Sequence, residues 1–250
     1  MVNQNLVTKN TLELRQSQSS FASEKKIGAI NTYKSMPLPN EKDEDWRYTE
    51  IEKLNLGNFE PFNAKTKITA SISDDMIEKG IVLTDINTAL EKYPKAQEYF
   101  FKSTRIDKDK FAALSASFFS NGIFLHVPKN IEVEEPIRVN FKMQDKTSVL
   151  HNIIIVDSNS KLQLIEEYSN KELSEEQLNS CVTEVFADND SSINFYHLNN
   201  WTKNVYNFIN IIGTARRNAA INWISGCFGG KLNRIRIDTN FNGQGSNCNN

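Results

Sequence analysis

The stretch Asn159-Ser160-Lys161-Leu162-Gln163-Leu164 is a short turn followed by an apolar–polar–apolar triplet. The same pattern returns 31 residues later as Asp190-Ser191-Ser192-Ile193-Asn194-Phe195, and 28 residues after that as Asn218-Ala219-Ala220-Ile221-Asn222-Trp223. An alternation with a period of two is typical of a strand with one buried face. A regular repeat of turn and strand predicts a solenoid, in which each turn of the chain stacks on the one before it.

The repeat extends in both directions from this stretch. Upstream, we align Ile131-Glu132-Val133 with Leu162-Gln163-Leu164, 31 residues later; downstream, Cys248-Asn249-Asn250 follows Ile221-Asn222-Trp223 by 27 residues. We therefore predict a mainly β protein in which residues 116–250 form a parallel β-helix. A β-sandwich is the alternative, because strands about 8–12 residues apart also suit that fold. An apolar strand is expected shortly before each turn, in five segments: Ile123 to Leu125, Ile153 to Val156, Val182 to Phe186, Phe208 to Ile212 and Ile235 to Phe241.

Residues 1–115 have a different pattern and are predicted to be mostly helical. Apolar residues recur at roughly helical spacing from Phe21 to Tyr33. Ser73 or Asp74 can cap a helix that starts at Asp75. Further helical stretches are expected at three places: Asp43 to Leu54, Leu90 to Phe101 with a break at Pro94, and Lys110 to Phe119.

The composition is ordinary for a soluble globular protein. Of the 250 residues, 39% are hydrophobic and 24% charged, and 29 basic against 31 acidic residues leave a net charge of −2. This balance does not favour binding to nucleic acid or to an anionic membrane. The three cysteines include no C-x-x-C pair, which argues against a zinc ribbon or a disulfide framework. Neither a signal peptide nor an apolar run long enough to cross a bilayer is visible, so a cytoplasmic protein is expected.

Longer segments around the aligned triplets, and one before them, carry a further pattern. Leu38-Pro39 is followed by Glu44-Asp45-Trp46-Arg47-Tyr48-Thr49, an acidic-x-Trp-basic-Tyr-Thr motif. The run from Gly122 to Ile131 leads into the first turn of the repeat, and Asn152 to Tyr168 forms the next. In this order and spacing, the segments resemble the SufB/SufD family of iron–sulfur cluster assembly scaffold proteins over roughly residues 36–250.

The resemblance implies a right-handed parallel β-helix preceded by a helical N-terminal region. It also implies a non-enzymatic scaffold subunit that pairs with a SufB-like paralogue, or with itself, and that binds a SufC-like ATPase. An iron–sulfur cluster is then expected only at the level of the assembled complex. Neither nucleic acid nor a membrane is an expected partner.

One position indicates which side of the family the chain resembles. SufB-type members carry Glu-Gly-Cys where this chain has Glu166-Glu167-Tyr168. A cysteine thiolate can act as a nucleophile and as an iron ligand, whereas a phenol cannot replace it in persulfide chemistry. The motif around Trp46 is also SufD-type, while the run from Asn204 to Phe208 resembles SufB-type members. We favour the SufD-like side.

Cys248 is the one candidate ligand for a metal or a cluster. Its register with Ile221 favours packing in the core instead, because a free cysteine behaves there as a small hydrophobe. Cys181 and Cys227 are interpreted as core residues for the same reason. No catalytic and no cofactor-binding residue is predicted.

The histidines and the paired glutamates are interpreted as solvated groups. His126, His151 and His197 are read as surface or turn residues rather than metal ligands. Glu166 and Glu167 would suit the acid–base chemistry of a glycosidase, but adjacent strand residues point to opposite faces and cannot converge on one atom. We expect a solvated strand end at this place.

Trp46 and Tyr48 are the candidates for docking a partner, because large aromatic side chains are enriched at interfaces. The alternative is that Trp46 packs on the protein's own core.

The repeat predicts that the chain stops inside a turn. Asn249 and Asn250 stand where the pattern requires a polar and then an apolar strand residue. Natural solenoids cover such an end, so we expect the chain to be part of a longer protein. A β-helical carbohydrate-active enzyme and a general β-solenoid interaction module are the alternative functions.

Overall fold

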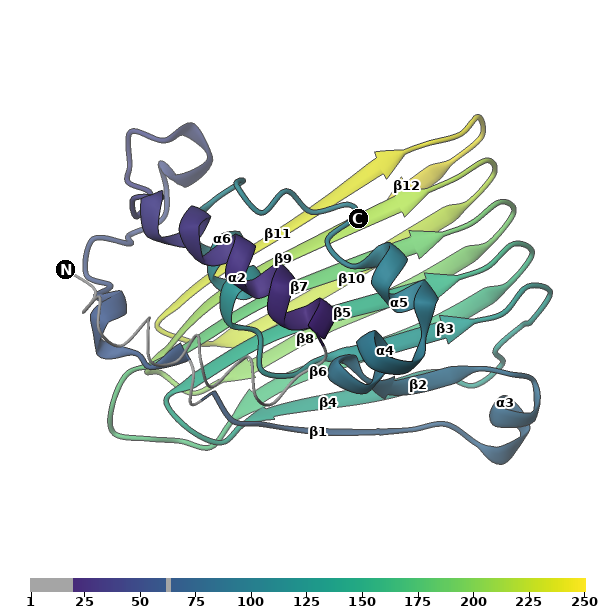
Figure 1. The fold of residues 1–250 in the computed structure, drawn as a ribbon, viewed down its shortest axis with the longest axis horizontal. Helices are drawn as coiled ribbons and strands as arrows, with labels where there is room; N and C mark the ends of the chain where they lie inside the picture. Colours follow the sequence, from purple (N-terminus) through teal and green to yellow (C-terminus); the bar gives the residue numbers. More distant parts are fainter. Residues whose placement is uncertain (1–19, 62–63) are drawn as a thin grey trace.

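Two six-stranded sheets pack face to face in the computed structural model, which describes residues 20–61 and 64–250 (Figure 1). We call one the open sheet; in spatial order its strands are β1 (Thr66–Ser71), β4 (Ile137–Met143), β6 (Lys161–Asn170), β8 (Ser192–Trp201), β10 (Ala220–Gly229) and β12 (Asn247–Asn249). We call the other the covered sheet, with β11 (Leu232–Phe241), β9 (Val205–Ala215), β7 (Gln177–Ala187), β5 (Thr147–Val156), β3 (Ile123–Val127) and β2 (Val82–Asp85).

The chain passes from one sheet to the other and back, so that each strand pairs in parallel with the strand two positions further along the chain. The predicted parallel solenoid is therefore confirmed, and the β-sandwich alternative is excluded. Two strands depart from this rule, because β1 pairs with β4 and β2 with β3 in antiparallel fashion. These two strands cover the first turn of the solenoid and satisfy backbone groups that would otherwise be unpaired.

The register of the repeat is confirmed in its later turns and wrong in its first. Leu162 lies opposite Ile193, which in turn lies opposite Ile221. In the first turn, however, Glu132 bridges to Lys161, so Val133 rather than Ile131 is the counterpart of Leu162. The first spacing is therefore 29 residues rather than 31. The displaced residues form a bulge before β4, whose first residue pairs with Leu164.

The corners of the solenoid explain this register. One residue at each corner has a positive φ: Asn130 at 64°, Asn159 at 59°, Asp190 at 59°, Asn218 at 54° and Gly245 at 76°. Asn, Asp and Gly tolerate this left-handed conformation better than other residues do. Neighbouring corners are also joined by side chains, since Asn159 Nδ2 donates to Asn130 Oδ1 at 3.1 Å and Asn218 Nδ2 to Asp190 Oδ1 at 2.8 Å.

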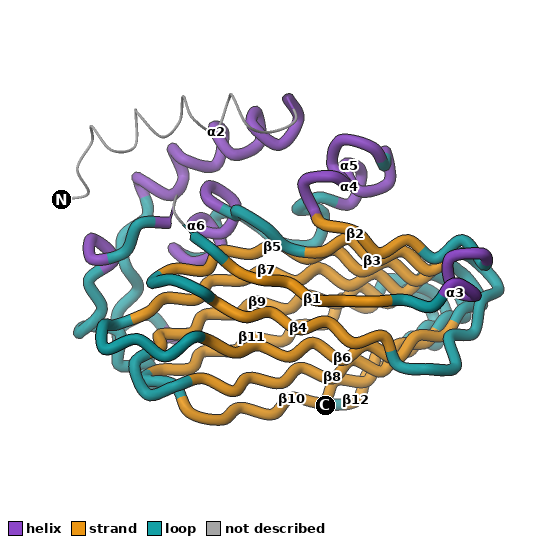
Figure 2. Tube along the Cα trace, turned by 90° about the horizontal axis from the view of Figure 1, so that it is seen from below, coloured by secondary structure: helices purple, strands orange, loops and turns teal. Residues whose placement is uncertain are grey.

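The helices lie on one side of the solenoid and bury the outer face of the covered sheet (Figure 2). As a result every residue of β5 and β7 is buried, whereas β4 alternates between buried and exposed residues. The covering helices are α2 (Ser20–Ser35), α4 (Ile86–Lys92), α5 (Pro94–Tyr99) and α6 (Lys110–Phe118), and the short α3 (Asp74–Glu78) lies near β1 and β2. No helix in the described ranges is long and apolar enough to cross a membrane.

The helical stretches predicted from Phe21 onward form except at one place, while residues 1–19 of the predicted helical region lie outside the described residues. Ser73 caps α3 by accepting from Met76 N, and Pro94 separates α4 from α5 by standing at the first position of α5. The expected helix over Asp43 to Leu54 is wrong, because only the 3-10 turn Glu44–Trp46 forms there, with a second such turn at Leu56–Asn58.

Two buried lysines join α2 and α6 by binding the C-terminal carbonyl groups of the opposite helix. Lys26 Nζ donates to Phe119 O at 2.6 Å, and Lys110 Nζ donates to Tyr33 O and, at 2.7 Å, to Met36 O. The last carbonyls of a helix have no partner within the helix and carry its negative dipole end, which favours a cation. Burial nevertheless lowers the pKa of Lys26 to about 7.

We expect this lysine to make stability rise with pH. Folded Lys26 releases its proton near pH 7 and unfolded Lys26 near pH 10.5. Between these values the unfolded state binds more protons, so the free energy of unfolding increases as the pH rises. Urea unfolding across this range should show a clearly larger increase in the wild type and in Lys25→Met than in Lys26→Met. The exposed Lys25→Met is the matched control, and parallel curves for all three proteins would contradict the prediction.

Candidate functional site

A cluster of polar side chains lies between the two sheets, inside the solenoid. Tyr168 is fully buried; its hydroxyl donates to Glu166 Oε2 at 2.9 Å and lies 3.6 Å from Cys181 Sγ. Asn152 Nδ2 donates to the Tyr168 hydroxyl at 3.0 Å and to Thr183 Oγ1 at 3.1 Å. The strands β5, β6 and β7 each contribute inward-facing residues to this cluster, so its geometry is set by the sheet registers.

The interior keeps the cysteine of this cluster unreactive. Burial, followed by the negative charge of Glu166, raises the pKa of the Cys181 thiol to about 12. Burial also raises the pKa of Tyr168 well above its ordinary value. Because the thiolate is the form that attacks electrophiles and binds iron, Cys181 offers neither chemistry at neutral pH. The Tyr168 ring is fixed further by stacking on Phe141 at 4.5 Å between ring centroids.

The solvated strand end expected at Glu166 is wrong, and so is the surface position expected for His197. Both are buried, with His197 Nδ1 lying 3.8 Å from Glu166 Oε2. Asn199 Nδ2 lies within hydrogen-bond distance of His197 Nε2, at 3.0 Å. Glu167 is exposed, as the alternation of a strand requires. The period of two from Leu162 was the signal that could have placed Glu166 inside.

His151 is also buried rather than at the surface, on the opposite face of the covered sheet. Its Nε2 lies 3.2 Å from Glu184 Oε2, although the two are not aligned for a hydrogen bond. The other carboxylate oxygen, Glu184 Oε1, accepts from Ser103 N at 2.7 Å, Ser103 Oγ at 2.9 Å and Thr104 N at 3.0 Å. This carboxylate therefore holds the segment after α5 against the sheet.

His126 is partly buried and does not stack on His151, in agreement with their spacing of less than one repeat. Its Nε2 lies 2.8 Å from Asp157 Oδ2, and Lys95 Nζ donates to the same carboxylate at 2.7 Å. Within the described residues, no group of three or more His, Cys, Asp or Glu side chains could hold a metal ion.

The three cysteines differ in how exposed they are. Cys181 is buried, as expected, and Cys248 is partly buried on β12 opposite Ile221. The core position expected for Cys227 is wrong, because this residue of β10 is exposed. It lies opposite Asn199 in the half of β10 after Trp223, where every residue is partly or fully exposed.

We expect alkylation to distinguish these thiols. With a maleimide reagent, Cys227 should react fastest, Cys248 more slowly, and Cys181 only after unfolding in urea, because burial withholds the Cys181 thiol and raises its pKa. Peptide mass spectrometry of samples quenched over time measures the three rates. Labelling of Cys181 in the folded protein at a rate near that of Cys227 would contradict the interior cluster described above.

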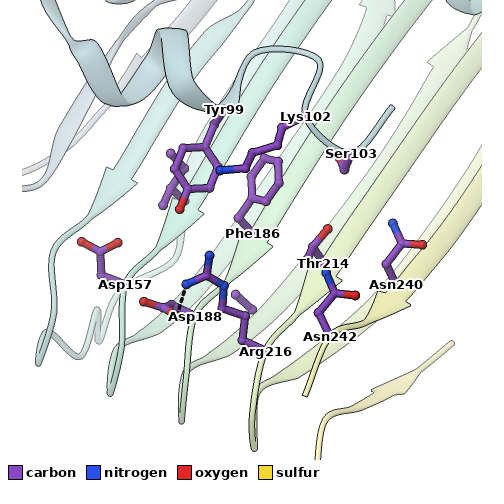
Figure 3. A pocket seen from close by; sticks show the side chains of 12 residues that line it. Tyr99, Lys102, Ser103, Asp157, Phe186, Asp188, Thr214, Arg216, Asn240 and Asn242 are labelled. Carbon is purple, nitrogen blue, oxygen red and sulfur yellow. Dashed lines mark hydrogen bonds and ion pairs between the residues drawn. The ribbon is translucent and has the colours of Figure 1, made fainter. Parts of the chain in front are cut away.

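A cavity of about 350 Å³ opens at the corner where the strands of the covered sheet end (Figure 3). Four of its residues follow successive strands and stack one turn above another: Asp157, Asp188, Arg216 and Asn242. The remaining walls come from the strands, from the end of α5 and from the segment that follows it: Tyr99, Lys102, Ser103, Ile155, Phe186, Ala187, Thr214 and Asn240.

The two carboxylates of this corner are ionised and paired. Burial opposes the ionisation of Asp157, but hydrogen bonds from Lys95 and His126 outweigh it and hold the pKa of Asp157 below its ordinary value. The pKa of Asp188 is lowered against burial in the same way, by the backbone of Asn189 and other donors. Arg216 Nη1 also lies 3.1 Å from Asp188 Oδ1. Neither carboxyl has the raised pKa that a general acid needs.

Trp46 and Tyr48 have opposite environments. Trp46 is 5% exposed and stacks on Phe111, with ring centroids 5.5 Å apart, in the packed position that was the alternative to docking. The Arg234 guanidinium also lies over the indole, 4.0 Å from the ring centroid. Tyr48 is 92% exposed, beside a hollow lined by the neighbouring polar residues. Docking of a partner at Tyr48 stays a prediction.

Sequence reasoning missed the contacts that hold this motif in place. Asp45 Oδ2 accepts from Arg236 Nη1 at 2.9 Å and lies 3.0 Å from Lys108 Nζ. Hydrogen bonds from Lys108 and Arg236 lower the pKa of Asp45. Because Asp45 and Arg236 are 191 residues apart, no local pattern indicates this pair.

Comparison with known proteins gives two family models that match adjoining parts of the chain. The model described as "SUF system FeS cluster assembly, SufBD core domain" matches residues 139–250, and "SufBD protein N-terminal region" matches residues 62–139. Together they span residues 62–250, which contain α3 to α6 and the solenoid.

Individual relatives agree with these models. The chain is 24% identical over 255 aligned residues to the iron-sulfur cluster assembly protein SufD of Bacillus subtilis, covering 88% of this chain and 58% of that protein. It is 28% identical over 165 residues to an iron-sulfur cluster assembly SufBD family protein of Staphylococcus epidermidis, covering 65% of this chain and 36% of that protein. A SufBD family protein of Staphylococcus haemolyticus gives 27% over 165 residues. The chain thus spans between about a third and three-fifths of the length of these relatives.

Proposed function

The chain belongs to the SufBD family of iron–sulfur cluster assembly proteins, and from this premise we propose that it is a SufD-like scaffold subunit without chemistry of its own. The observation that carries the proposal is Tyr168, which stands where SufB-type members have cysteine. Its side chain points into the solenoid, and the nearest thiol, that of Cys181, is kept protonated. This interior supports the fold and supplies no thiolate at that position.

In this proposal the subunit acts through protein partners. It pairs with a SufB-like paralogue or with itself and binds a SufC-like ATPase. It holds no cofactor alone, and an iron–sulfur cluster forms only in the assembled complex. Three free cysteines suit a reducing, cytoplasmic setting.

One geometric observation favours the competing enzyme hypothesis, a β-helical carbohydrate-active protein. Two carboxylates, Asp157 and Asp188, lie on successive turns at the corner cavity. Glycoside hydrolysis, however, requires one carboxylic acid with a raised pKa, and both of these carboxyls have lowered ones. The scaffold function therefore explains more of the structure. A general β-solenoid interaction module differs from it only in its partners.

Co-expression tests the proposal. The protein, in the form its gene encodes, is co-expressed with the SufB-like and SufC-like proteins of the same organism and purified through a tag on the SufC-like ATPase. We expect all three proteins to be recovered, with iron and sulfide dependent on the SufB-like partner. Recovery of the ATPase and the SufB-like protein without this chain, or an unchanged cluster yield when the chain is omitted, would contradict the scaffold role.

A further inference from the structure

The face of the open sheet that points away from the core carries an apolar patch, and no helix of the described residues lies over it (Figure 2). Ile224 and Phe228 on this face are 50% and 62% exposed. Isolated exposed apolar residues are common, whereas a contiguous patch on one face marks an interaction site. The patch is built by five residues from three neighbouring strands: Ile165, Tyr196, Leu198, Ile224 and Phe228.

The strand registers make this patch continuous. Ile165, Tyr196 and Ile224 form one column across β6, β8 and β10. The next column contains Leu198 and Gly226. A Cβ atom at Gly226 would lie 3.0 Å from Leu198 Cδ2 and 3.3 Å from the Phe228 ring, so the absence of a side chain lets these two residues close over the backbone.

Basic side chains border the patch on the side of β1 and β4. Arg138 lies beside Ile165, and Lys67 lies directly opposite Lys142. All three cations are exposed, and none forms an ion pair with another described residue. Like charges directly opposite each other destabilise a sheet. Protection of the edge strand β1 against aggregation accounts for Lys67, but not for Arg138 and Lys142 on the second strand.

We propose that this face docks a protein whose own surface presents apolar side chains bordered by carboxylates. The apolar patch supplies the buried centre of such an interface, and the unpaired cations supply complementary charge at its rim. Two copies of this chain fit less well, because the described strands of the open sheet carry three unpaired cations against one exposed carboxylate, Glu167, and pairing would oppose like charges. An anionic membrane or a nucleic acid would contact cations spread over the whole face, whereas these lie on one side of it.

A direct binding measurement tests the docking face. The probe is a fluorescently labelled ferredoxin apoprotein, chosen because it is small and acidic. The choice of a protein that requires an iron–sulfur cluster rests on the proposed function. We expect binding that weakens with added salt. We further expect about tenfold weaker binding in Lys67→Glu/Lys142→Glu and in Ile224→Ser/Phe228→Ser, since loss of either the charge or the apolar centre removes part of the interface. The matched control is Lys92→Glu/Lys129→Glu, two exposed lysines away from this face, which should bind like the wild type.

Several results would overturn the proposal. Absence of ferredoxin binding, equal binding by all variants, or equal binding of the basic protein cytochrome c would each do so. Binding of phosphatidylserine vesicles or of oligothymidylate, lost in the same variants, would reassign the face to a membrane or a nucleic acid. A dimer in sedimentation that the variants dissociate would reassign it to self-association. Failure to recover the SufC-like ATPase, with ferredoxin binding intact, would contradict the proposed function and leave the docking face standing.

Discussion

Replacement of Trp46 by alanine is expected to lower the free energy of unfolding by about 3–5 kcal/mol, the range typical of a buried tryptophan. The indole is 5% exposed and contacts the Phe111 ring and the Arg234 guanidinium, with the Phe208 ring centroid at 6.1 Å. Its loss therefore removes apolar burial, aromatic contact and a cation–π contact at once. Urea unfolding monitored by circular dichroism measures the change.

The reason for the size of this effect is the position of Trp46 between two parts of the molecule. Phe111 belongs to α6, while Phe208 and Arg234 belong to β9 and β11 of the covered sheet. The variant should therefore also lose protection from proteolysis in the segment around the 3-10 turn Glu44–Trp46 before the solenoid unfolds.

Tyr48→Ala is the matched control for this prediction. Tyr48 lies two residues away and is 92% exposed, so its removal should change stability by less than about 0.5 kcal/mol. If Trp46→Ala were as mild as Tyr48→Ala, the motif would not hold the N-terminal region to the solenoid. If Tyr48→Ala left stability unchanged but weakened recovery of a partner, the docking prediction for Tyr48 would gain its first support.

The solenoid was predictable from sequence because each turn must present apolar residues to the same interior. That requirement repeats along the chain and survives in the columns that Leu162, Ile193 and Ile221 form. The first turn was misaligned because Ile131 and Val133 are both apolar, so hydrophobicity alone could not separate the two registers. The corner asparagines Asn130 and Asn159 fix the register, since the left-handed conformation restricts those positions more than the strand interior does.

The interior polar cluster was missed for a different reason. Glu166 and His197 were assigned to solvent by residue type, although the period of two from Leu162 to Tyr168 places Glu166 on the inner face. Polar residues can occupy that face only if they find partners inside the solenoid. Asn152 supplies one for Glu166 from 14 residues away, which hides it from a local pattern, whereas Asn199 lies only two residues after His197 on the same strand.

Replacement of Glu184 by alanine is expected to cost about 3–5 kcal/mol of stability, the range for breaking a buried charged group's contacts. Glu184 is fully buried, and its Oε1 accepts three hydrogen bonds from Ser103 and Thr104, so the substitution leaves buried donors without an acceptor. The buried His151 would then also lose its carboxylate neighbour, whose Oε2 lies 3.2 Å from His151 Nε2. Urea unfolding gives the overall change, and hydrogen exchange at the Ser103 and Thr104 amides gives the local one.

Glu184→Gln separates the two roles of this carboxylate. The amide oxygen of glutamine can still accept from Ser103 and Thr104, while the negative charge beside His151 is lost. If the hydrogen bonds dominate, Glu184→Gln should retain most of the stability and the slow exchange of both amides; if the charge dominates, it should resemble Glu184→Ala. Because Ser103 lines the corner cavity beside Phe186 and Thr214, release of this segment by Glu184→Ala should also open the cavity wall. Unchanged exchange at both amides in Glu184→Ala would show that the packing of α5 and α6, rather than this carboxylate, positions the segment.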